Sequence, residues 1–259
     1  MKILVCVKQI PDMASKFKPN ADGTWFNEAD LAFRMNEYDE YAVEEAVKLR
    51  EKDPASELVV LSVGPARVVE ALKKALAMGC DRAVHVQDDN VFRKDPWQIA
   101  SLIAAYAKKE NFDIVFTGMQ SQDRGSAQIG PLLAGMLGFS CVTTVIGFSL
   151  EGRTATVRRE LEGGAKGIVK AALPAVITCQ LGLNTPRYPT LPNIMKAKKK
   201  EIAAFKAEEL SAEAALSAAE KFYAPVKKGT GLVLEGGDAA SLAGKLIDVL
   251  KEKTTVLRG

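Results

Sequence analysis

The sequence has few cysteines and a single histidine, and both shortages limit its chemistry. None of the four cysteines has CxxC spacing, and each lies in or beside an apolar segment, where cysteine behaves as a small buried side chain. His85 stands in an apolar segment with no cysteine, serine or acidic partner nearby, so we expect a core residue and not a catalytic base. These patterns argue against a metal site and against nucleophilic catalysis.

Long apolar runs and a strong net charge are also lacking. No run approaches the roughly 18 to 20 residues that a spanning helix needs, and KILVCV follows the first methionine without the features of a signal or transit peptide. A net charge of +3 is too small for a nucleic-acid footprint over the whole surface, and 47% hydrophobic residues is ordinary for a globular chain. We therefore expect a cytoplasmic protein with no membrane insertion and no nucleic-acid partner.

Neither a Walker A sequence nor a GxGxxG after a strand is present, but strands and helices alternate clearly. Continuous apolar runs predict buried strands, and the segments between them have the period of amphipathic helices, with Glu44 and Glu45 on a polar helix face. Four such units predict a doubly wound α/β fold of Rossmann-like type with a mainly parallel sheet. The expected strands are 2–7, 57–64, 82–86 and 113–118, and the expected helices are 36–52, 65–79 and 95–110.

Three regions depart from this alternation. Residues 9–35 contain the turn sequence NADGTW, which predicts a small β-excursion near the carboxyl end of the first strand, where open α/β sheets place ligands. After Gly138 the period changes to 2, and TTVIGFSL, RTATVRREL and PAVITCQ predict antiparallel strands at one edge. In 201–259 we expect a helix over 208–222 and a last amphipathic helix capped by Asp238.

The loop GMQSQDRGSAQIG, residues 118–130, is the best candidate for a ligand site. It leaves the fourth strand and opens a helix, so Gly125, Ser126, Arg124 and the helix N-terminus together suit one phosphate group. An ordinary strand-helix turn with a polar cap explains the loop equally well. The acidic start of the first helix, residues 36–39, suits ribose hydroxyls or an adenine edge, and we expect Trp25 to be a packing residue.

Five segments resemble, in order, the β subunit of electron-transfer flavoproteins. They span roughly residues 1 to 200, and the last two are long enough to be highly specific: VKQIPD, NEYDEYAVEEAVKL, ALAMGCDRAVHV, VRRELEGGAKGIVKAALPAVITC and NTPRYPTLPNIMKAKKK. The resemblance implies a heterodimer whose α subunit holds most of the FAD, with AMP bound in this chain for structure. It also implies an electron carrier and not an enzyme.

The resemblance places ligand contacts on particular residues. The AMP contacts that it implies are Cys6, Asn36, Glu37, Tyr38, Asp39, Val63, Arg124, Gly125, Ser126, Ala127, Gln128, Ile129, Gly130 and Gly135. Pro11, Asp12 and Met13 are implied to lie near the partner's flavin, with Met13 where some members have an aromatic residue. Lys166 stands where the family pattern has a glutamate that contacts the mobile flavin domain, so the charge at this contact is reversed.

The stretch RYPTLPNIMKAKKK, residues 187–200, resembles the family's recognition loop for acyl-CoA dehydrogenases. The implied contact residues are Tyr188, Pro189, Leu191 as the anchor, Pro192, Ile194 and Met195. Flanking prolines lower the entropy that an exposed loop loses on binding, and burying one leucine yields about 2 kcal/mol, which suits a transient complex. The lysines that follow either steer acidic partners or form an ordinary solvated charge run.

The expected protein therefore has a nucleotide-binding α/β domain over 1–200 and an extended C-terminal arm over 201–259 that wraps the α subunit. The resemblance implies that electrons pass from acyl-CoA dehydrogenases through the FAD to a membrane quinone oxidoreductase, while the flavin domain swings on a static base. Two alternatives stay open: a bifurcating relative with a second FAD in place of AMP, and a free-standing adenine-nucleotide-binding domain on the same fold.

Overall fold

The computed structural model describes residues 1–21, 23–29, 31–211, 213–223, 226, 229 and 231–255. Contacts divide the chain into a body, Met1–Phe222, and a terminal unit, Tyr223–Gly259. Within the described residues, no helix is both long and apolar enough to cross a membrane.

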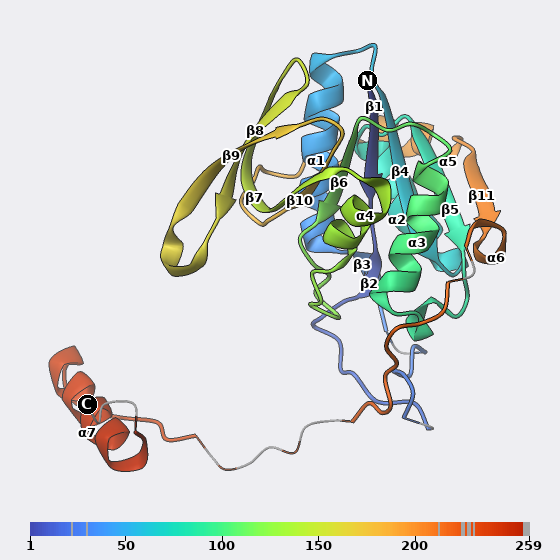
Figure 1. The fold of residues 1–259 in the computed structure, drawn as a ribbon. Coiled ribbons are helices and arrows are strands. Elements are labelled where there is room, and N and C mark those ends of the chain that lie inside the picture. Colours follow the sequence, from blue (N-terminus) through green and yellow to red (C-terminus); the bar gives the residue numbers. More distant parts are fainter. Residues whose placement is uncertain are drawn as a thin grey trace. The chain divides into compact units, whose positions relative to one another are not determined.

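The body is built on one nine-stranded sheet (Figure 1). The first seven strands in spatial order are parallel to their neighbours, and the last two pair antiparallel. The spatial order is β11 (Ile202–Lys206), β5 (Arg82–Gln87), β4 (Glu57–Gly64), β1 (Lys2–Cys6), β6 (Ile114–Gly118), β10 (Ala175–Cys179), β7 (Ser140–Glu151), β8 (Thr154–Glu160) and β9 (Lys166–Ala172).

Alternate side chains of the central strands enter two separate cores. Ile3 and Val5 of β1 pack with helices α1 (Glu37–Lys52) and α2 (Val69–Met78), while Leu4 and Cys6 pack with α3 (Pro96–Ala107) and α4 (Ile129–Leu137). A strand covered on both faces must be apolar at every position, which explains the continuous apolar runs. The doubly wound α/β fold is confirmed.

The antiparallel edge is smaller than the sequence indicated. The prediction is correct for β7 and β8, which pair antiparallel, but wrong for PAVITCQ. That segment forms β10, which lies parallel between β6 and β7 and is buried at every position. Its unbroken apolar run reflects burial on both faces rather than a period of 2. The third antiparallel strand is β9, which we did not predict.

The excursion after β1 forms as expected. β2 (Gln9–Pro11) and β3 (Phe33–Met35) pair antiparallel at the carboxyl end of β1, and a bridge joins Pro19 to Phe26 around the turn. Asn20 holds this turn because its side-chain oxygen accepts hydrogen bonds from the backbone N–H groups of Thr24 and Trp25. The excursion is therefore a small folded segment beside the main sheet.

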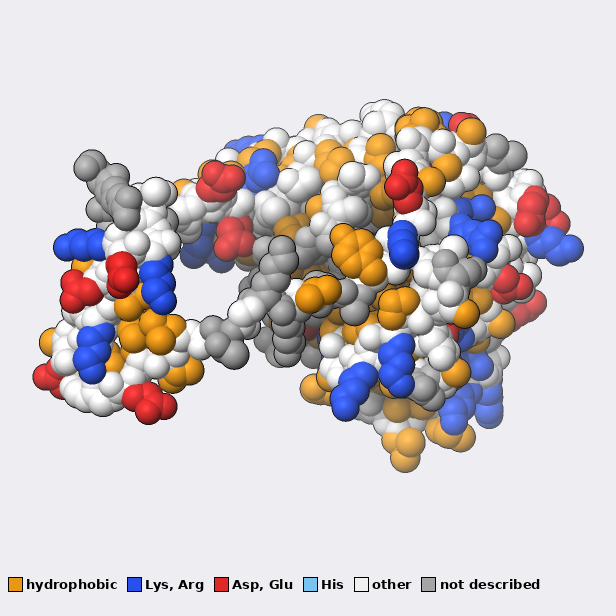
Figure 2. Space-filling view, turned by 90° about the horizontal axis from the view of Figure 1, so that it is seen from below, with side chains coloured by type: hydrophobic (Ala, Val, Ile, Leu, Met, Phe, Trp, Pro, Cys, Tyr) orange, Lys and Arg blue, Asp and Glu red, His pale blue; other side chains and the backbone are white. Residues whose placement is uncertain are grey.

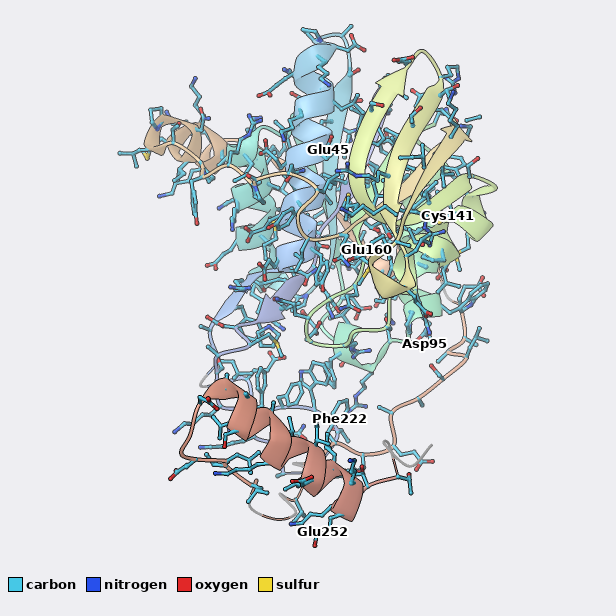
Figure 3. All side chains as sticks on the ribbon, turned by 90° about the vertical axis from the view of Figure 1, so that its left-hand side faces the viewer. Glu45, Asp95, Cys141, Glu160, Phe222 and Glu252 are labelled. Carbon is cyan, nitrogen blue, oxygen red and sulfur yellow. The ribbon has the colours of Figure 1, made fainter. Side chains whose placement is uncertain are left out.

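The helix predicted over 208–222 is wrong beyond its first turn. Only α6 (Ala207–Leu210) is helical, and the described residues that follow are extended along the body. Asp95, labelled in Figure 3, caps α3 in a capping box. Its side chain also accepts hydrogen bonds from the backbone N–H groups of Leu216 and Ser217 at 2.6 and 2.9 Å. This segment satisfies its polar backbone through the body instead of through its own helix.

The terminal unit contains α7 (Ala239–Lys253), capped as predicted by Asp238, whose side chain accepts a hydrogen bond from the Ser241 N–H at 2.8 Å. Leu246 and Ile247 of α7 remain 48% and 44% exposed. Both side chains belong to the apolar face of this amphipathic helix.

Candidate functional site

A cavity lies at the carboxyl ends of β1, β4 and β6. Its volume is about 1200 Å³, including the open solvent at its mouth, and residues from all three strand ends line it. β1 lies between β4 and β6, so the connections that leave the sheet here go to opposite sides, which is where open α/β sheets bind ligands. Figure 2 views this end of the body, where hydrophobic side chains lie among Lys and Arg side chains.

Most of the residues expected to contact AMP line this cavity. They come from β1, the start of α1, the end of β4 and the loop before α4: Cys6, Asn36, Asp39, Val63, Arg124, Ser126, Ala127, Gln128 and Ile129. Glu37, Tyr38, Gly125, Gly130 and Gly135 do not line it. Gly130 packs against β10 instead, because a Cβ there would lie 2.3 Å from Thr178 Cγ2. Gly135 lies exposed on α4.

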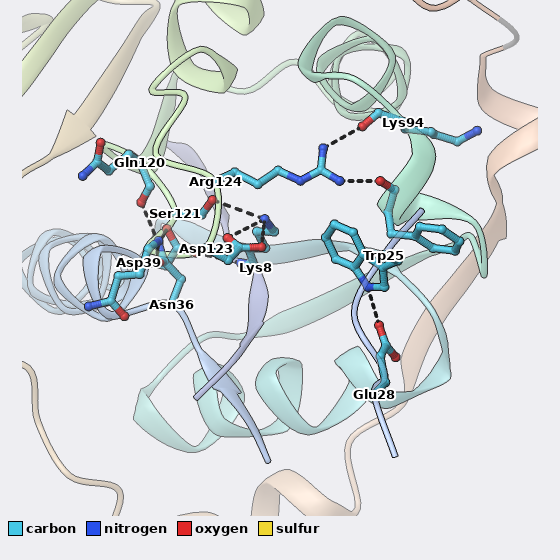
Figure 4. A network of polar contacts seen from close by, with 12 residues as sticks. Lys8, Trp25, Glu28, Asn36, Asp39, Lys94, Gln120, Ser121, Asp123 and Arg124 are labelled. Carbon is cyan, nitrogen blue, oxygen red and sulfur yellow. Dashed lines mark hydrogen bonds and ion pairs between the residues drawn. The ribbon is translucent and has the colours of Figure 1, made fainter. Parts of the chain in front are cut away.

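A buried carboxylate forms the floor of the cavity (Figure 4). Asp39 accepts hydrogen bonds from the backbone N–H of Lys8 at 2.7 Å, the backbone N–H of Gly118 at 3.1 Å and the Asn36 side chain at 3.0 Å. The Asn36 amide also donates to the Gln120 carbonyl at 2.9 Å. Asp39 therefore ties the ends of β1 and β6 to the start of α1. This role is one of positioning, and the contact with ribose hydroxyls or an adenine edge that the sequence suggested stays a prediction.

Burial controls the ionisation of Asp39. Desolvation raises its pKa from 3.8 to about 7, and the hydrogen bonds from Lys8, Asn36 and Gly118 oppose that rise because they favour the charged form. Beside it, the Lys8 ammonium binds both carboxylate oxygens of Asp123 at 2.7 Å and the Ser121 hydroxyl at 3.2 Å. The positive charge of Lys8 is thus neutralised within the protein.

The loop before α4 presents backbone donors to the cavity. Gln128 at the N-cap makes no side-chain capping bond, and within the described part of the chain no hydrogen bond is made by the backbone N–H groups of Ser126, Ala127 and Gln128. Gly125 and Ala127 have φ of 61° and 53°, and left-handed residues beside right-handed ones form a concave nest of N–H groups. Together with the positive end of α4, this geometry suits a phosphate.

Arg124 lines the cavity but is held by neutral partners (Figure 4). Its guanidinium donates to the carbonyl oxygens of Phe92 and Lys94 and lies 5.2 Å from the centre of the Trp25 ring. Because no carboxylate binds it among these contacts, its positive charge is available to attract an anion. Trp25 is a packing residue, as expected, with its ring centre 5.5 Å from that of Phe92. It also lines the cavity, and its Nε1 donates to Glu28 at 2.9 Å.

The residues expected near a flavin lie at the edge of this region. Pro11 lines the cavity, whereas Asp12 and Met13 do not, and Met13 is 44% exposed. Asp12 accepts the backbone N–H of Ala14 at 3.0 Å and so shapes the turn after β2. Lys166 begins β9 and is exposed. The structure therefore leaves Met13 and Lys166 accessible.

Residues 188–195 form a second surface, which we call the α5 tip. Thr190 caps α5 (Leu191–Lys198), and four large apolar side chains are exposed there: Tyr188 by 94%, Leu191 by 72%, Ile194 by 36% and Met195 by 51%. Exposed apolar side chains gathered on one surface mark an interaction site. Lys200, at the end of the lysine run, donates to the Cys80 carbonyl oxygen at 2.9 Å, so it attaches the end of residues 187–200 to the body.

The α5 tip is supported by an ion-pair fork that the sequence analysis missed. Arg187 binds both carboxylate oxygens of Glu44 at 2.8 and 3.0 Å and both of Glu51 at 2.6 and 3.1 Å. Glu44 is 3% exposed, so its placement on the polar face of the helix is wrong. The helical period contains a signal for this burial. Glu44 lies next to Val43 and three positions before Val47, and both valines are buried.

The single histidine and the cysteines carry no visible chemistry. His85 is 3% exposed, with Nε2 2.8 Å from the Gly64 carbonyl oxygen, which confirms a core residue. Cys6, Cys80 and Cys179 are buried, and burial raises the pKa of each thiol. Cys141 is exposed, which corrects the expectation that all four are buried. It is the second residue of β7, in the part of that strand that pairs parallel with β10.

Comparison with known proteins gives consistent matches. The family described as "Electron transfer flavoprotein domain" matches residues 23–210. The chain is 41% identical over 260 residues to "Electron transfer flavoprotein subunit beta, mitochondrial" of Oryza sativa subsp. indica, covering 99% of this chain and 100% of that protein. It is 38% identical to "Electron transfer flavoprotein subunit beta" of Bacillus subtilis, covering 86% and 88%, and 41% identical to the human protein of that name, covering 82% and 84%.

Proposed function

The chain belongs to the electron transfer flavoprotein family as a β subunit, and we propose that with an α subunit it carries electrons from acyl-CoA dehydrogenases to a membrane quinone oxidoreductase. In this proposal the α subunit holds most of the FAD, and this chain binds AMP, which is not consumed. The observation that carries the proposal is the pairing of a cavity with a few polar groups at the sheet's switch point with an exposed apolar tip on the same body.

The cavity suits AMP by its position at the carboxyl ends of the parallel strands and by its hydrogen-bond donors. The open N–H groups at 126–128 and the Arg124 guanidinium would hold the phosphate, while the apolar ends of β1 and β4 would cover the base. A bound nucleotide would then contact strands β1, β4 and β6 together and stabilise the folded body.

The α5 tip suits a partner that binds and leaves at each transfer. Leu191 is the anchor in this proposal, because it is 72% exposed and sits at the first turn of α5 beside Pro192. Burying one leucine gives about 2 kcal/mol, which orients a partner without making a permanent complex. Arg187 fixes the stem of the tip to α1, so little conformational entropy is lost when a dehydrogenase docks.

The residues of this chain bind and position, and none is assigned a chemical step. The flavin, when bound, supplies the reversible uptake and release of electrons. This chain holds the nucleotide, presents the α5 tip and offers Met13 and Lys166 toward the flavin domain, whose swing brings the redox centre to each partner in turn. With Lys166 in place of a glutamate, this contact requires an acidic or neutral group on the flavin domain.

A single analysis of bound nucleotides tests the proposal. The chain is purified with its α subunit and also alone, each sample is denatured, and the released nucleotides are separated and quantified. One AMP and one FAD per heterodimer is the expected result. Two flavins and no AMP would instead establish the bifurcating alternative, and a stable chain without its partner that holds ATP would establish the free-standing nucleotide-binding domain.

A further inference from the structure

The segment that follows α6 is tied to the start of α3. Gln98 donates from Nε2 to the Glu213 carbonyl oxygen at 2.9 Å, and the Asp95 carboxylate accepts the two backbone N–H groups of residues 216–217. These contacts join positions 115 to 122 residues apart in the sequence. We call residues 213–222 the strap, because they lie outside any helix or strand and are nevertheless held on the body.

The strap ends against the excursion that follows β1. The backbone N–H of Phe222 donates to the Gly23 carbonyl oxygen at 2.8 Å. The Phe222 ring, labelled in Figure 3, meets the Trp25 ring edge-on, with ring centres 5.4 Å apart and planes at 87°. It also lies 5.7 Å from the ring of Phe26. Edge-to-face aromatic pairs of this geometry are favourable beyond the area that they bury, so Phe222 supports Trp25.

Trp25 connects the strap to the phosphate end of the cavity (Figure 4). The Arg124 guanidinium lies over the Trp25 ring, 5.2 Å from its centre, and the attraction between a cation and an aromatic face favours that position. The same guanidinium donates to the carbonyl oxygens of Phe92 and Lys94. Trp25 and Arg124 both line the cavity, whereas Phe222 does not. Phe222 therefore acts on a ligand through these neighbours.

Arg124 differs from the other cationic residues that line the cavity. Each of the others has a carboxylate partner: Lys8 with Asp123, Arg67 with Glu28 and Lys94 with Asp88. The polar partners of Arg124 are carbonyl oxygens, so its charge is left for an anionic ligand. Its side chain is exposed, and a long exposed side chain that is already held in place loses less entropy when it binds.

We propose that Phe222 is a positioning residue for the nucleotide phosphate, because through Trp25 it holds the Arg124 guanidinium in place. The inference rests on the nucleotide-binding function proposed above and adds a residue that touches no ligand. Arg124 lies directly before the open N–H groups of 126–128, so the effect belongs to the phosphate and not to the base or the ribose. Loss of the Phe222 ring should therefore weaken a nucleotide and spare the nucleoside.

The test uses the heterodimer after removal of its nucleotide, titrated calorimetrically with AMP and with adenosine, which lacks the phosphate. In Phe222→Ala the affinity for AMP should fall about fivefold, because the support of the cation–aromatic contact is lost. The affinity for adenosine should stay within about twofold of the parent value. Phe222→Tyr keeps the ring and should restore the AMP affinity. Tyr223→Ala is the control, because it removes the next aromatic side chain, which is 77% exposed, and should leave both affinities unchanged.

A double-mutant cycle with Arg124→Gln separates this path from a general loosening of the body. Arg124→Gln alone should weaken AMP binding by about tenfold or more. Adding Phe222→Ala should then weaken it by less than about twofold further, because the group that Phe222 positions is gone. Urea denaturation of each variant checks that the body is folded. Phe222→Leu, which keeps apolar volume without the ring, takes the place of Phe222→Ala if that variant does not fold.

The possible failures are separable. Unchanged AMP affinity in Phe222→Ala, an equal loss for AMP and adenosine, or full additivity with Arg124→Gln overturns the role of Phe222 while leaving the nucleotide site intact. An equal loss in Tyr223→Ala overturns it too, because the effect then does not depend on the ring at position 222. If the parent binds neither AMP nor adenosine, the proposed nucleotide function itself is wrong.

Discussion

The cavity and the α5 tip of the same body are opposite in character. The cavity is concave, and its polar groups are tied to one another, as when Asp39 accepts three hydrogen bonds at the junction of β1, β6 and α1. The α5 tip is convex, and its large side chains, with Tyr188 at 94% exposure, contact little of the body. Rearranging the cavity would break hydrogen bonds, whereas the side chains of the α5 tip are exposed and can contact a partner.

Under the proposed function, this difference would let one scaffold hold a resident ligand and meet a transient partner. A preorganised cavity with fixed donors lowers the cost of binding and favours long residence. A small apolar surface gives modest affinity and fast release. Changes to the cavity should therefore act on stability and ligand content, and changes to the α5 tip should act on transfer rate alone.

The largest effect is expected from Asp39→Ala. The substitution leaves the buried backbone N–H groups of Lys8 and Gly118 without an acceptor, so the free energy of unfolding should fall by about 3 kcal/mol, measured by urea denaturation. Asp12→Ala is the control, because Asp12 accepts only the exposed N–H of Ala14 and its loss should cost about 0.5 kcal/mol or less. Equal losses in the two variants would contradict the role given to Asp39.

The pH dependence of the unfolding free energy tests the burial of Asp39 separately. Burial raises the pKa of Asp39 to about 7 from 3.8, so the folded protein binds this proton more tightly than the unfolded chain does. The associated stability is complete below about pH 4 and is lost as pH rises through about 7, by an amount on the order of 2 kcal/mol or more. Asp39→Asn cannot ionise and should flatten this slope in denaturation series at fixed ionic strength. A slope that persists in the variant would refute the assignment.

At the α5 tip, Leu191→Ala should slow electron acceptance from an acyl-CoA dehydrogenase by about tenfold, because the lost burial is worth roughly 1 to 2 kcal/mol. Nucleotide content and unfolding free energy should stay within about 0.5 kcal/mol of the parent, since Leu191 is 72% exposed. Equal rates for Leu191→Ala and the parent in stopped-flow reduction would remove the anchor role.

The smallest effect is expected in the phosphate loop. Ala127 has a φ of 53°, a conformation that costs an L-residue about 1 kcal/mol and costs glycine almost nothing. Ala127→Gly should raise the unfolding free energy by about 0.5 kcal/mol after the added entropy of the unfolded chain is subtracted. Ala14→Gly, in an exposed turn without positive φ, should be neutral or slightly destabilising. Destabilisation of both would show that Ala127 is not strained.

Local signals in the sequence were enough for much of the fold and part of the site. Continuous apolar runs located the parallel strands β1, β4, β5 and β6, and Asp95-Pro96 located the start of α3, where the capping box forms. Residues 118–130 were identified because glycine, charge and a helix start occur together, and the loop does open into the cavity. Each of these features depends on residues close together in the chain.

The features that were missed depend on contacts between distant segments. Glu44 and Arg187 lie 143 positions apart, so nothing local shows that they bind each other. The position of β10 between β6 and β7 is a matter of topology, which a period within one strand does not encode. Gln9 follows the first strand in the sequence, and only the fold shows that it lines the cavity and that, among the described residues, its buried Oε1 has no hydrogen-bond partner.

The contrast between a resident ligand and a transient partner is tested most directly by isotope exchange during turnover. The heterodimer with its own AMP is mixed with radiolabelled AMP, driven through many cycles of reduction by a dehydrogenase and reoxidation, and then separated from free nucleotide. The account predicts that bound label stays far below one per heterodimer and does not increase with the number of cycles. Incorporation of label in proportion to the cycles completed would contradict it.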